Sequence, residues 1–100
     1  MNFGLDQNVI TKIRQIFAKF QKIDQVIIYG SRAIGNHKNG SDIDLALIGC
    51  SLNFNYQCKI EVELDKLMIP YSFDIAIYDQ IDNQDLIDHI QKYGKIFYKL

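Results

Sequence analysis

Two neighbouring stretches organise this chain: Ile27-Ile28-Tyr29-Gly30-Ser31 and, after ten intervening residues, Asp42-Ile43-Asp44-Leu45-Ala46. The first is an apolar run that ends at a glycine. The second alternates acidic and apolar residues with a period of two, which is typical of a strand. Residues i and i+2 of a strand point to one face, so we expect the carboxylates of Asp42 and Asp44 to lie side by side. The predicted core positions on the opposite face are Ile43, Leu45 and Leu47.

Two adjacent carboxylates on a partly buried strand repel each other and lose solvation. A divalent cation that prefers oxygen ligands relieves both costs, so Asp42 and Asp44 are candidate metal ligands. The alternative is a pair of solvated acids on an edge strand. A helix cap at Ser41-Asp42 fits less well, because the residues that follow have a strand period and not a helical one.

The Gly30-Ser31 pair predicts a tight turn ten residues before the acids. Backbone N–H groups at such a turn bind phosphate. Ser31 can cap a short helix over Arg32–Gly35, donate its hydroxyl to a phosphate, or do both. Arg32 follows directly, and the fork of a guanidinium suits phosphate. The spacing from Gly30 to Gly35 resembles a P-loop, but Asn36 and His37 follow in place of Lys and Ser or Thr, so a Walker-type ATPase is excluded.

Length and composition narrow the function classes. A chain of 100 residues makes one domain, residues 1–100, with little room for a separate substrate domain. The net charge of −1 gives no basic footprint for direct nucleic-acid binding. No apolar run approaches the roughly 20 residues of a membrane span. The N-terminus carries no signal peptide, and Cys50 and Cys58 have no metal-ligand spacing, so we expect a reduced, cytoplasmic protein.

Periodicity predicts an α/β (α+β) fold with a small mixed β-sheet and helices. The predicted helices are 5–20, 32–35, 54–68 and 84–93, and the predicted strands are 25–29, 41–48, 73–78 and, as strand or extended tail, 95–100. On 54–68 the candidate apolar contacts are Cys58, Val62, Leu64, Leu67 and Met68. Asp82 or Asn83 is the predicted cap of the last helix and Gly94 its C′ stop, while His89 is a solvated or packing residue.

Loop lengths predict the strand directions. Ten residues are too few for a parallel crossover, so strands 25–29 and 41–48 should be antiparallel, which brings the glycine turn to the acids. The helix over 54–68 is long enough for a crossover, so strand 73–78 should run parallel to 41–48. Both strands then begin at one edge, and Asp74 lands near Asp42 and Asp44. The alternative for Asp74 is again a solvated strand acid.

Gly30-Ser31, ten residues, Asp42-x-Asp44 and a third acid at Asp74 together resemble the signature of the DNA polymerase beta type nucleotidyltransferases. The resemblance extends over most of the chain and is strongest to the minimal nucleotidyltransferase (MNT) branch, whose members are antitoxins paired with HEPN ribonucleases. It implies two Mg²⁺ ions held by the three acids and ATP phosphates bound by Gly30, Ser31 and Arg32. The family commonly has a second Arg two residues after the first, and here that position is Ile34.

Three functions stay open at this point. The resemblance implies transfer of AMP from ATP to a tyrosine of a partner HEPN toxin, which silences its ribonuclease activity. A second hypothesis is a binding antitoxin of the same fold that neutralises its partner by contact alone. A third is an enzyme that transfers a nucleotide to a small molecule, for which the short chain leaves little room.

Overall fold

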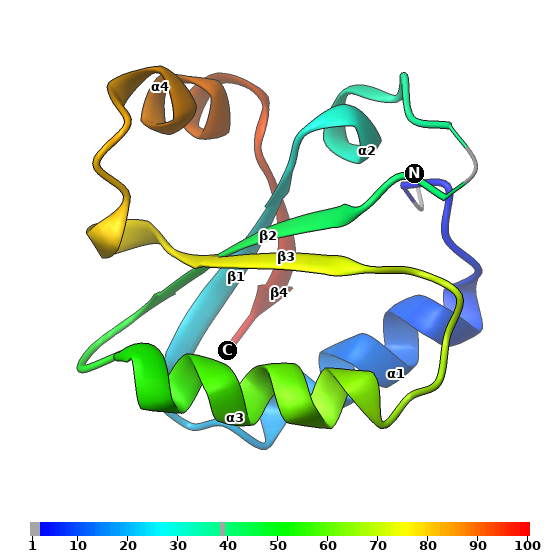
Figure 1. Ribbon diagram of the computed structural model, residues 1–100, viewed down its shortest axis with the longest axis horizontal. Helices are drawn as coiled ribbons and strands as arrows, with labels where there is room; N and C mark the ends of the chain where they lie inside the picture. Colours follow the sequence, from blue (N-terminus) through cyan, green and yellow to red (C-terminus); the bar gives the residue numbers. More distant parts are fainter. Residues whose placement is uncertain (1–2, 39) are drawn as a thin grey trace.

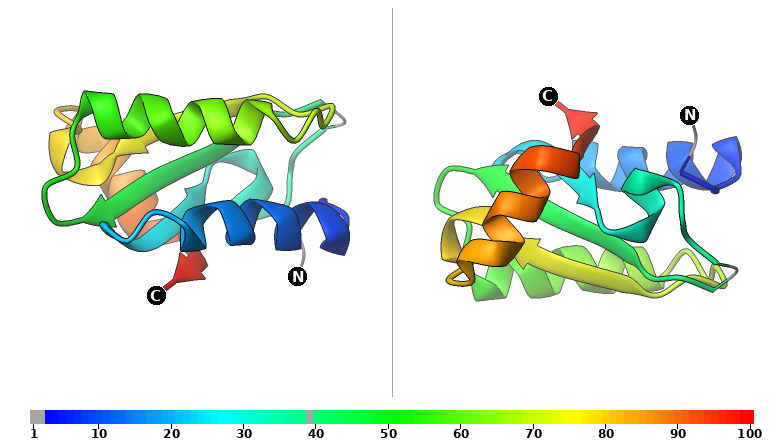
Figure 2. Two further views of the ribbon diagram at one scale, coloured as in Figure 1. Left: turned by 90° about the horizontal axis from the view of Figure 1, so that it is seen from below. Right: turned by 90° about the horizontal axis from the view of Figure 1, so that it is seen from above.

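The computed structural model describes residues 3–38 and 40–100 and confirms a mixed α/β fold. One four-stranded sheet has the order β3-β2-β1-β4. Figure 1 labels the helices and strands, and Figure 2 shows α1 and α3 on one side of the sheet and α4 on the other. The elements are α1 Gln7–Ala18, β1 Ile23–Tyr29, α2 Ser31–Ile34, β2 Ile43–Gly49, α3 Phe54–Asp65, β3 Phe73–Ile77, the 3-10 turn η1 Tyr78–Gln80, α4 Gln84–Tyr93 and β4 Lys95–Lys99.

The strand directions are as predicted. β1 pairs antiparallel with β2, and β2 pairs parallel with β3 through the α3 crossover. The last residues form a true strand, β4, which pairs antiparallel with β1 on the edge opposite β3. The predicted core positions of β2 are buried, with Ile43 and Leu45 at 0% exposure and Leu47 at 1%.

The main core lies between the sheet and the two helices α1 and α3. From α1 it takes Ile10, Ile13, Ile16 and Phe17, which have the three- and four-residue spacing of a helical face. A smaller cluster of Tyr29, Ala46 and Ile90 lies under α4 on the other face. Within the described residues, no helix is long and apolar enough to cross a membrane.

Two details of α3 and α4 differ from the prediction. Ile60 and Leu64 are the buried residues of α3, whereas Val62 and Met68 are 53% and 89% exposed. The predicted contacts of Val62 and Met68 were therefore wrong. Val62 lies off the inward face that Ile60 and Leu64 form with a spacing of four. Met68 lies beyond the end of α3 at Asp65 and has a positive φ of 54°, so it does not continue that face. Asn83 does cap α4, accepting from Leu86 N–H at 3.3 Å.

Gly94 ends α4 as predicted, but not with a left-handed conformation. Its φ of −64° and ψ of 147° are extended. The glycine is required by space, because a Cβ here would overlap the carbonyl oxygen of Ile90 and the side chain of Ile27. This close approach lets the chain pass directly from α4 into β4.

Side chains from α1 and α3 donate hydrogen bonds to main-chain carbonyl groups on the two edge strands, β4 and β3. Arg14 Nε donates to the carbonyl of Phe97 on β4 at 2.7 Å. Gln57 Nε2 donates to the carbonyl of Ile75 on β3 at 3.0 Å. Blocked carbonyls on an edge strand disfavour pairing with another chain, so these contacts protect the two edges of the sheet.

Candidate functional site

A row of polar side chains crosses three strands at the same register. Tyr29 on β1 is the partner of Asp44 on β2, and Asp44 is the partner of Asp74 on β3. Side chains in register on neighbouring strands lie about 5 Å apart on one face. The structure therefore brings Asp44 and Asp74 together as predicted and adds Tyr29 as a neighbour.

Asp42 lies just before β2 on the same face as Asp44, and both Asp42 and Asp74 are exposed while Asp44 is half-buried. The three carboxylates thus share one edge that solvent and a ligand can reach. Within residues 3–38 and 40–100, no three His, Cys, Asp or Glu side chains are gathered into an arrangement that holds a metal ion as it stands. Asp42, Asp44 and Asp74 are neighbours on the sheet, but their side chains do not converge on one point.

The electrostatics of Asp44 suit a cation. Burial raises the pKa of the Asp44 carboxyl, and the negative charges of Asp74 and Asp42 raise that pKa further. The positive charge of Arg32 acts in the opposite direction. An all-oxygen donor set whose members repel one another fits a hard divalent cation such as Mg²⁺, which would offset the repulsion and favour the ionised form.

Gly30 joins β1 to α2 directly beside this row. Its φ of 76° and ψ of −157° lie in a region that is accessible almost only to glycine. A Cβ at this position would overlap Oδ2 of Asp44 and lie 3.2 Å from Asp44 Cγ. The absence of a side chain at Gly30 is what lets the turn and the carboxylate occupy adjacent space.

Ser31 begins the short helix α2. The carbonyl of Gly30 accepts from Ala33 N–H at 3.1 Å and from Ile34 N–H at 3.2 Å. Among the residues that the structure describes, the Ser31 hydroxyl makes no hydrogen bond to protein. Ser31 is half-buried. The predicted capping role was wrong, because Gly30 occupies the N-cap position and no side chain caps α2. A contact of the Ser31 hydroxyl with phosphate stays a prediction.

Arg32 has a different role from the predicted phosphate contact. Its side chain is only 2% exposed. Nε and Nη2 donate to the carbonyl of Ser41 at 3.1 and 2.9 Å, Nη1 donates to the carbonyl of Phe3 at 3.0 Å, and the guanidinium lies over the Tyr71 ring at 5.0 Å. The predicted contact of Arg32 with phosphate is therefore corrected, because its guanidinium donates to main-chain carbonyl groups instead. Through the carbonyl of Ser41, Arg32 fixes the backbone just before Asp42.

The hydrogen bonds from Arg32 to the carbonyls of Ser41 and Phe3, here called the Arg32 clamp, predict a large loss of stability when Arg32 is replaced. Replacing Arg32 with methionine should lower the free energy of unfolding by about 3 kcal/mol, since buried carbonyls lose charged donors. The matched control is Arg14→Met, which removes one carbonyl contact and a stacking contact with the Phe97 ring from an exposed arginine and should cost about 1 kcal/mol. Urea unfolding of both variants checks the order, and an equal cost at the two positions would contradict the clamp.

Tyr29 carries the second perturbed group of the site. Burial, followed by the charges of Asp74 and Asp44, raises the pKa of the Tyr29 phenol from 10.0 to about 12. Because the folded-state pKa is raised, this contribution to stability is complete below pH 10 and is lost as the pH rises toward 12.

Alkaline unfolding tests this assignment. Between pH 9 and pH 11.5, we expect the wild type to lose about 2 kcal/mol more free energy of unfolding than Tyr29→Phe, which has no phenol to ionise at this position. Urea unfolding at both pH values measures the difference. Identical losses in the two proteins would show that the phenol of Tyr29 is not held neutral by the fold.

A contact that the sequence did not reveal comes from α4. His89 was predicted to be solvated or a packing residue, yet its Nε2 accepts a hydrogen bond from Gly30 N–H at 3.1 Å. The two residues are 59 positions apart, so no local motif announces the contact. The packing part of the prediction holds, because the imidazole lies against Tyr29 and Tyr93.

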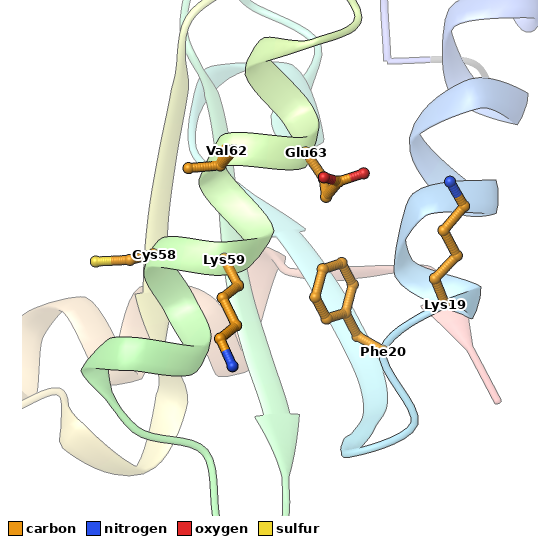
Figure 3. A pocket seen from close by; sticks show the side chains of 6 residues that line it. All are labelled: Lys19, Phe20, Cys58, Lys59, Val62 and Glu63. Atoms are coloured by element: carbon orange, nitrogen blue, oxygen red, sulfur yellow. The ribbon is translucent and has the colours of Figure 1, made fainter.

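A surface pocket lies away from Asp42, Asp44 and Asp74. It is an open hollow of about 450 Å³ between the end of α1 and α3, on the opposite face of the sheet (Figure 3). Its lining consists of Lys19, Phe20, Cys58, Lys59, Val62 and Glu63. These residues include neither the row of acids nor the glycine turn, so the carboxylate edge is the candidate site.

Comparison with known proteins defines the class. The pattern of the family described as "Polymerase beta, Nucleotidyltransferase" matches residues 11–100, and the chain belongs to this nucleotidyltransferase family. No curated protein sequence matches the chain.

Several solved structures with a similar fold are toxin–antitoxin complexes. A toxin–antitoxin structure with AMP-PNP gives a TM-score of 0.72 at 20% identity, over 96% of this chain and 75% of that one. A complex of an MNT antitoxin with a tri-AMPylated HEPN toxin from Shewanella oneidensis gives 0.70 at 16%, over 96% and 74%. A structure of the toxin–antitoxin MntA-HepT gives 0.70 at 16%, over 95% and 74%. At these identities the likeness establishes the fold.

Proposed function

We propose that this protein is a Mg²⁺-dependent antitoxin that transfers AMP from ATP to a tyrosine of a partner HEPN ribonuclease and so neutralises it. The observation that supports this most is the register of Asp44 with Asp74 beside the Gly30 turn. With this register the three carboxylates and the Gly30 turn lie at one edge of the sheet, which supports a site for Mg²⁺ and phosphate there. The similar solved structures that contain AMP-PNP or an AMPylated toxin suggest the nucleotide and the acceptor.

AMP transfer requires groups that bind Mg²⁺, accept a proton and orient the triphosphate. The tyrosine oxygen of the partner bonds to the α-phosphorus of ATP while the bond from that phosphorus to the bridging oxygen breaks, and pyrophosphate leaves. Mg²⁺ held by Asp42, Asp44 and Asp74 would neutralise the charge on the phosphates. Asp74 is exposed on β3 and would take the proton of the tyrosine hydroxyl. The backbone N–H and the hydroxyl of Ser31, which the Gly30 turn places beside the acids, would orient the triphosphate.

A second candidate is neutralisation by contact alone. The observation in its favour is that the three acids adjoin one another without forming a closed metal-binding cluster among the described residues. In that case the fold would serve as a binding surface, and the acids would contribute only charge.

Ribonuclease suppression separates the two candidates. The HEPN-type partner is incubated with this protein, ATP and Mg²⁺, the antitoxin is then removed, and ribonuclease activity is measured. Under the enzymatic proposal the partner stays silent after removal of the wild type and is active after treatment with Asp42→Asn. Recovery of activity after removal of the wild type would favour the binding antitoxin and contradict the proposal.

A small-molecule acceptor is tested in the same reaction. Pyrophosphate release is followed with and without the partner. We expect release only when the partner is present, because the proposed acceptor is a tyrosine of the partner. Sustained release with small-molecule acceptors and no partner would instead indicate the third hypothesis.

A further inference from the structure

His89 is held firmly against the glycine turn. Its imidazole is half-buried, with ring centroids 6.3 Å from Tyr29 at an interplanar angle of 76° and 5.2 Å from Tyr93 at 48°. These aromatic neighbours fix the ring so that Nε2 faces Gly30 N–H. Because Nε2 accepts this hydrogen bond, it is the unprotonated nitrogen of the ring.

The hydrogen bond determines the orientation of the peptide unit that enters the turn. Gly30 lies just beyond the last residue of β1, so the antiparallel pairing with β2 stops at Tyr29 and gives its N–H no partner. Its carbonyl is engaged by Ala33 and Ile34 at the start of α2. His89 therefore supplies the acceptor that a partly buried N–H requires, and both polar groups of Gly30 are fixed.

The position of Gly30 bears directly on the acids. Its Cα packs against the Asp44 carboxylate closely enough that a Cβ would overlap Oδ2. A rotation of the Tyr29–Gly30 peptide would thus move the turn relative to Asp44 and to Ser31. His89 reaches the site from α4, which covers the face of the sheet that carries the acids (Figure 2).

We propose that His89 is a positioning residue that holds the Gly30 turn in its nucleotide-binding orientation. This inference rests on the proposed function, since it assigns the turn to the phosphates of ATP. Loss of the Nε2 acceptor leaves the turn free to leave this orientation, so nucleotide affinity falls. The chemistry at the three carboxylates is unaffected once the nucleotide is bound.

Two substitutions separate the hydrogen bond from the packing. His89→Phe keeps an aromatic ring between Tyr29 and Tyr93 but has no acceptor. His89→Gln can place an acceptor oxygen near the Nε2 position. For His89→Phe we expect the KM for ATP to rise about ten-fold with kcat within about three-fold of wild type, which is the pattern of lost binding to ground and transition state alike. For His89→Gln the KM should return to within about three-fold of wild type.

Two further measurements, ATP affinity by calorimetry and exchange of the Gly30 amide hydrogen, do not depend on AMP transfer. The amide should exchange about ten-fold faster in His89→Phe and near the wild-type rate in His89→Gln. An unchanged KM or ATP affinity in His89→Phe would overturn the inference. Equal losses in both variants would overturn it as well, because they indicate a structural role only.

Failure of the proposed function would look different. If the wild type binds ATP but transfers no AMP, the proposed function fails, and weaker ATP binding by His89→Phe still supports the positioning role. If the wild type binds no ATP, both are overturned.

Discussion

Replacing Asp44 with asparagine is expected to lower the rate of AMP transfer by about a thousand-fold or more, because a neutral amide removes a charge from the group that holds Mg²⁺. The structure predicts no matching loss of stability. Burial and the charges of Asp74 and Asp42 already disfavour the ionised carboxylate, as the raised pKa of Asp44 indicates. The free energy of unfolding of Asp44→Asn should therefore equal or exceed that of the wild type.

Measuring both AMP transfer and stability separates a loss of activity from a loss of folding. Transfer is measured by incorporation of labelled AMP into the partner, and stability by urea unfolding of the same preparations. A matched control is Asp24→Asn, which removes one exposed acid from β1 away from this edge and should leave the rate unchanged. Wild-type transfer by Asp44→Asn would remove the carboxylate edge from the mechanism. A lower free energy of unfolding would contradict the conclusion that burial and repulsion disfavour the ionised Asp44 carboxylate.

Replacing Gly30 with alanine should affect both stability and activity. The backbone conformation at Gly30 strongly disfavours any side chain, and a Cβ would overlap the Asp44 carboxylate. We expect a loss of about 3 kcal/mol in the free energy of unfolding. AMP transfer should fall by at least about a hundred-fold, since the turn and Asp44 must move apart.

Gly40 provides the control for this substitution. It also has a positive φ, of 84°, but a Cβ at Gly40 would meet nothing within 4 Å. Gly40→Ala should therefore cost only the backbone term, about 1 kcal/mol, and leave AMP transfer close to wild type. If the two variants lose equal stability and activity, the close approach of Gly30 to Asp44 is not what the site requires.

Local patterns were sufficient to predict most of the fold. The period of two over β2, the loop of ten residues and the long crossover helix gave the strand directions, and these brought Asp42, Asp44 and Asp74 to one edge. The bounds of α4 also follow from its cap and its final glycine. These features depend on residues that are close in sequence, where periodicity and loop length act directly.

The errors arose where distant contacts determine the outcome. Apolar residues occur around most of α3, so the sequence did not show that Ile60 faces the sheet and Val62 faces solvent. Arg32 follows Gly-Ser and resembles a phosphate ligand, but its acceptors on Phe3 and Ser41 become neighbours only in the folded chain. The contact of His89 with Gly30 depends equally on tertiary structure.

Arg32 and His89 support the carboxylate edge from opposite sides. Arg32 fixes the backbone before Asp42 by binding the carbonyl of Ser41. His89 fixes the backbone of the Gly30 turn from α4. Both residues act on main-chain groups, so they set the positions of the acids and the turn without touching the three carboxylates through any hydrogen bond that the described residues show.

Intact-mass spectrometry of the HEPN-type partner tests the central claim most directly. The partner is incubated with ATP, Mg²⁺ and either the wild type or Asp42→Asn, and its mass is then measured. We expect a gain of one or more AMP units on a partner tyrosine with the wild type and none with Asp42→Asn. No gain in mass, with the ribonuclease still suppressed by both proteins, would contradict the account and leave an antitoxin that acts by binding alone.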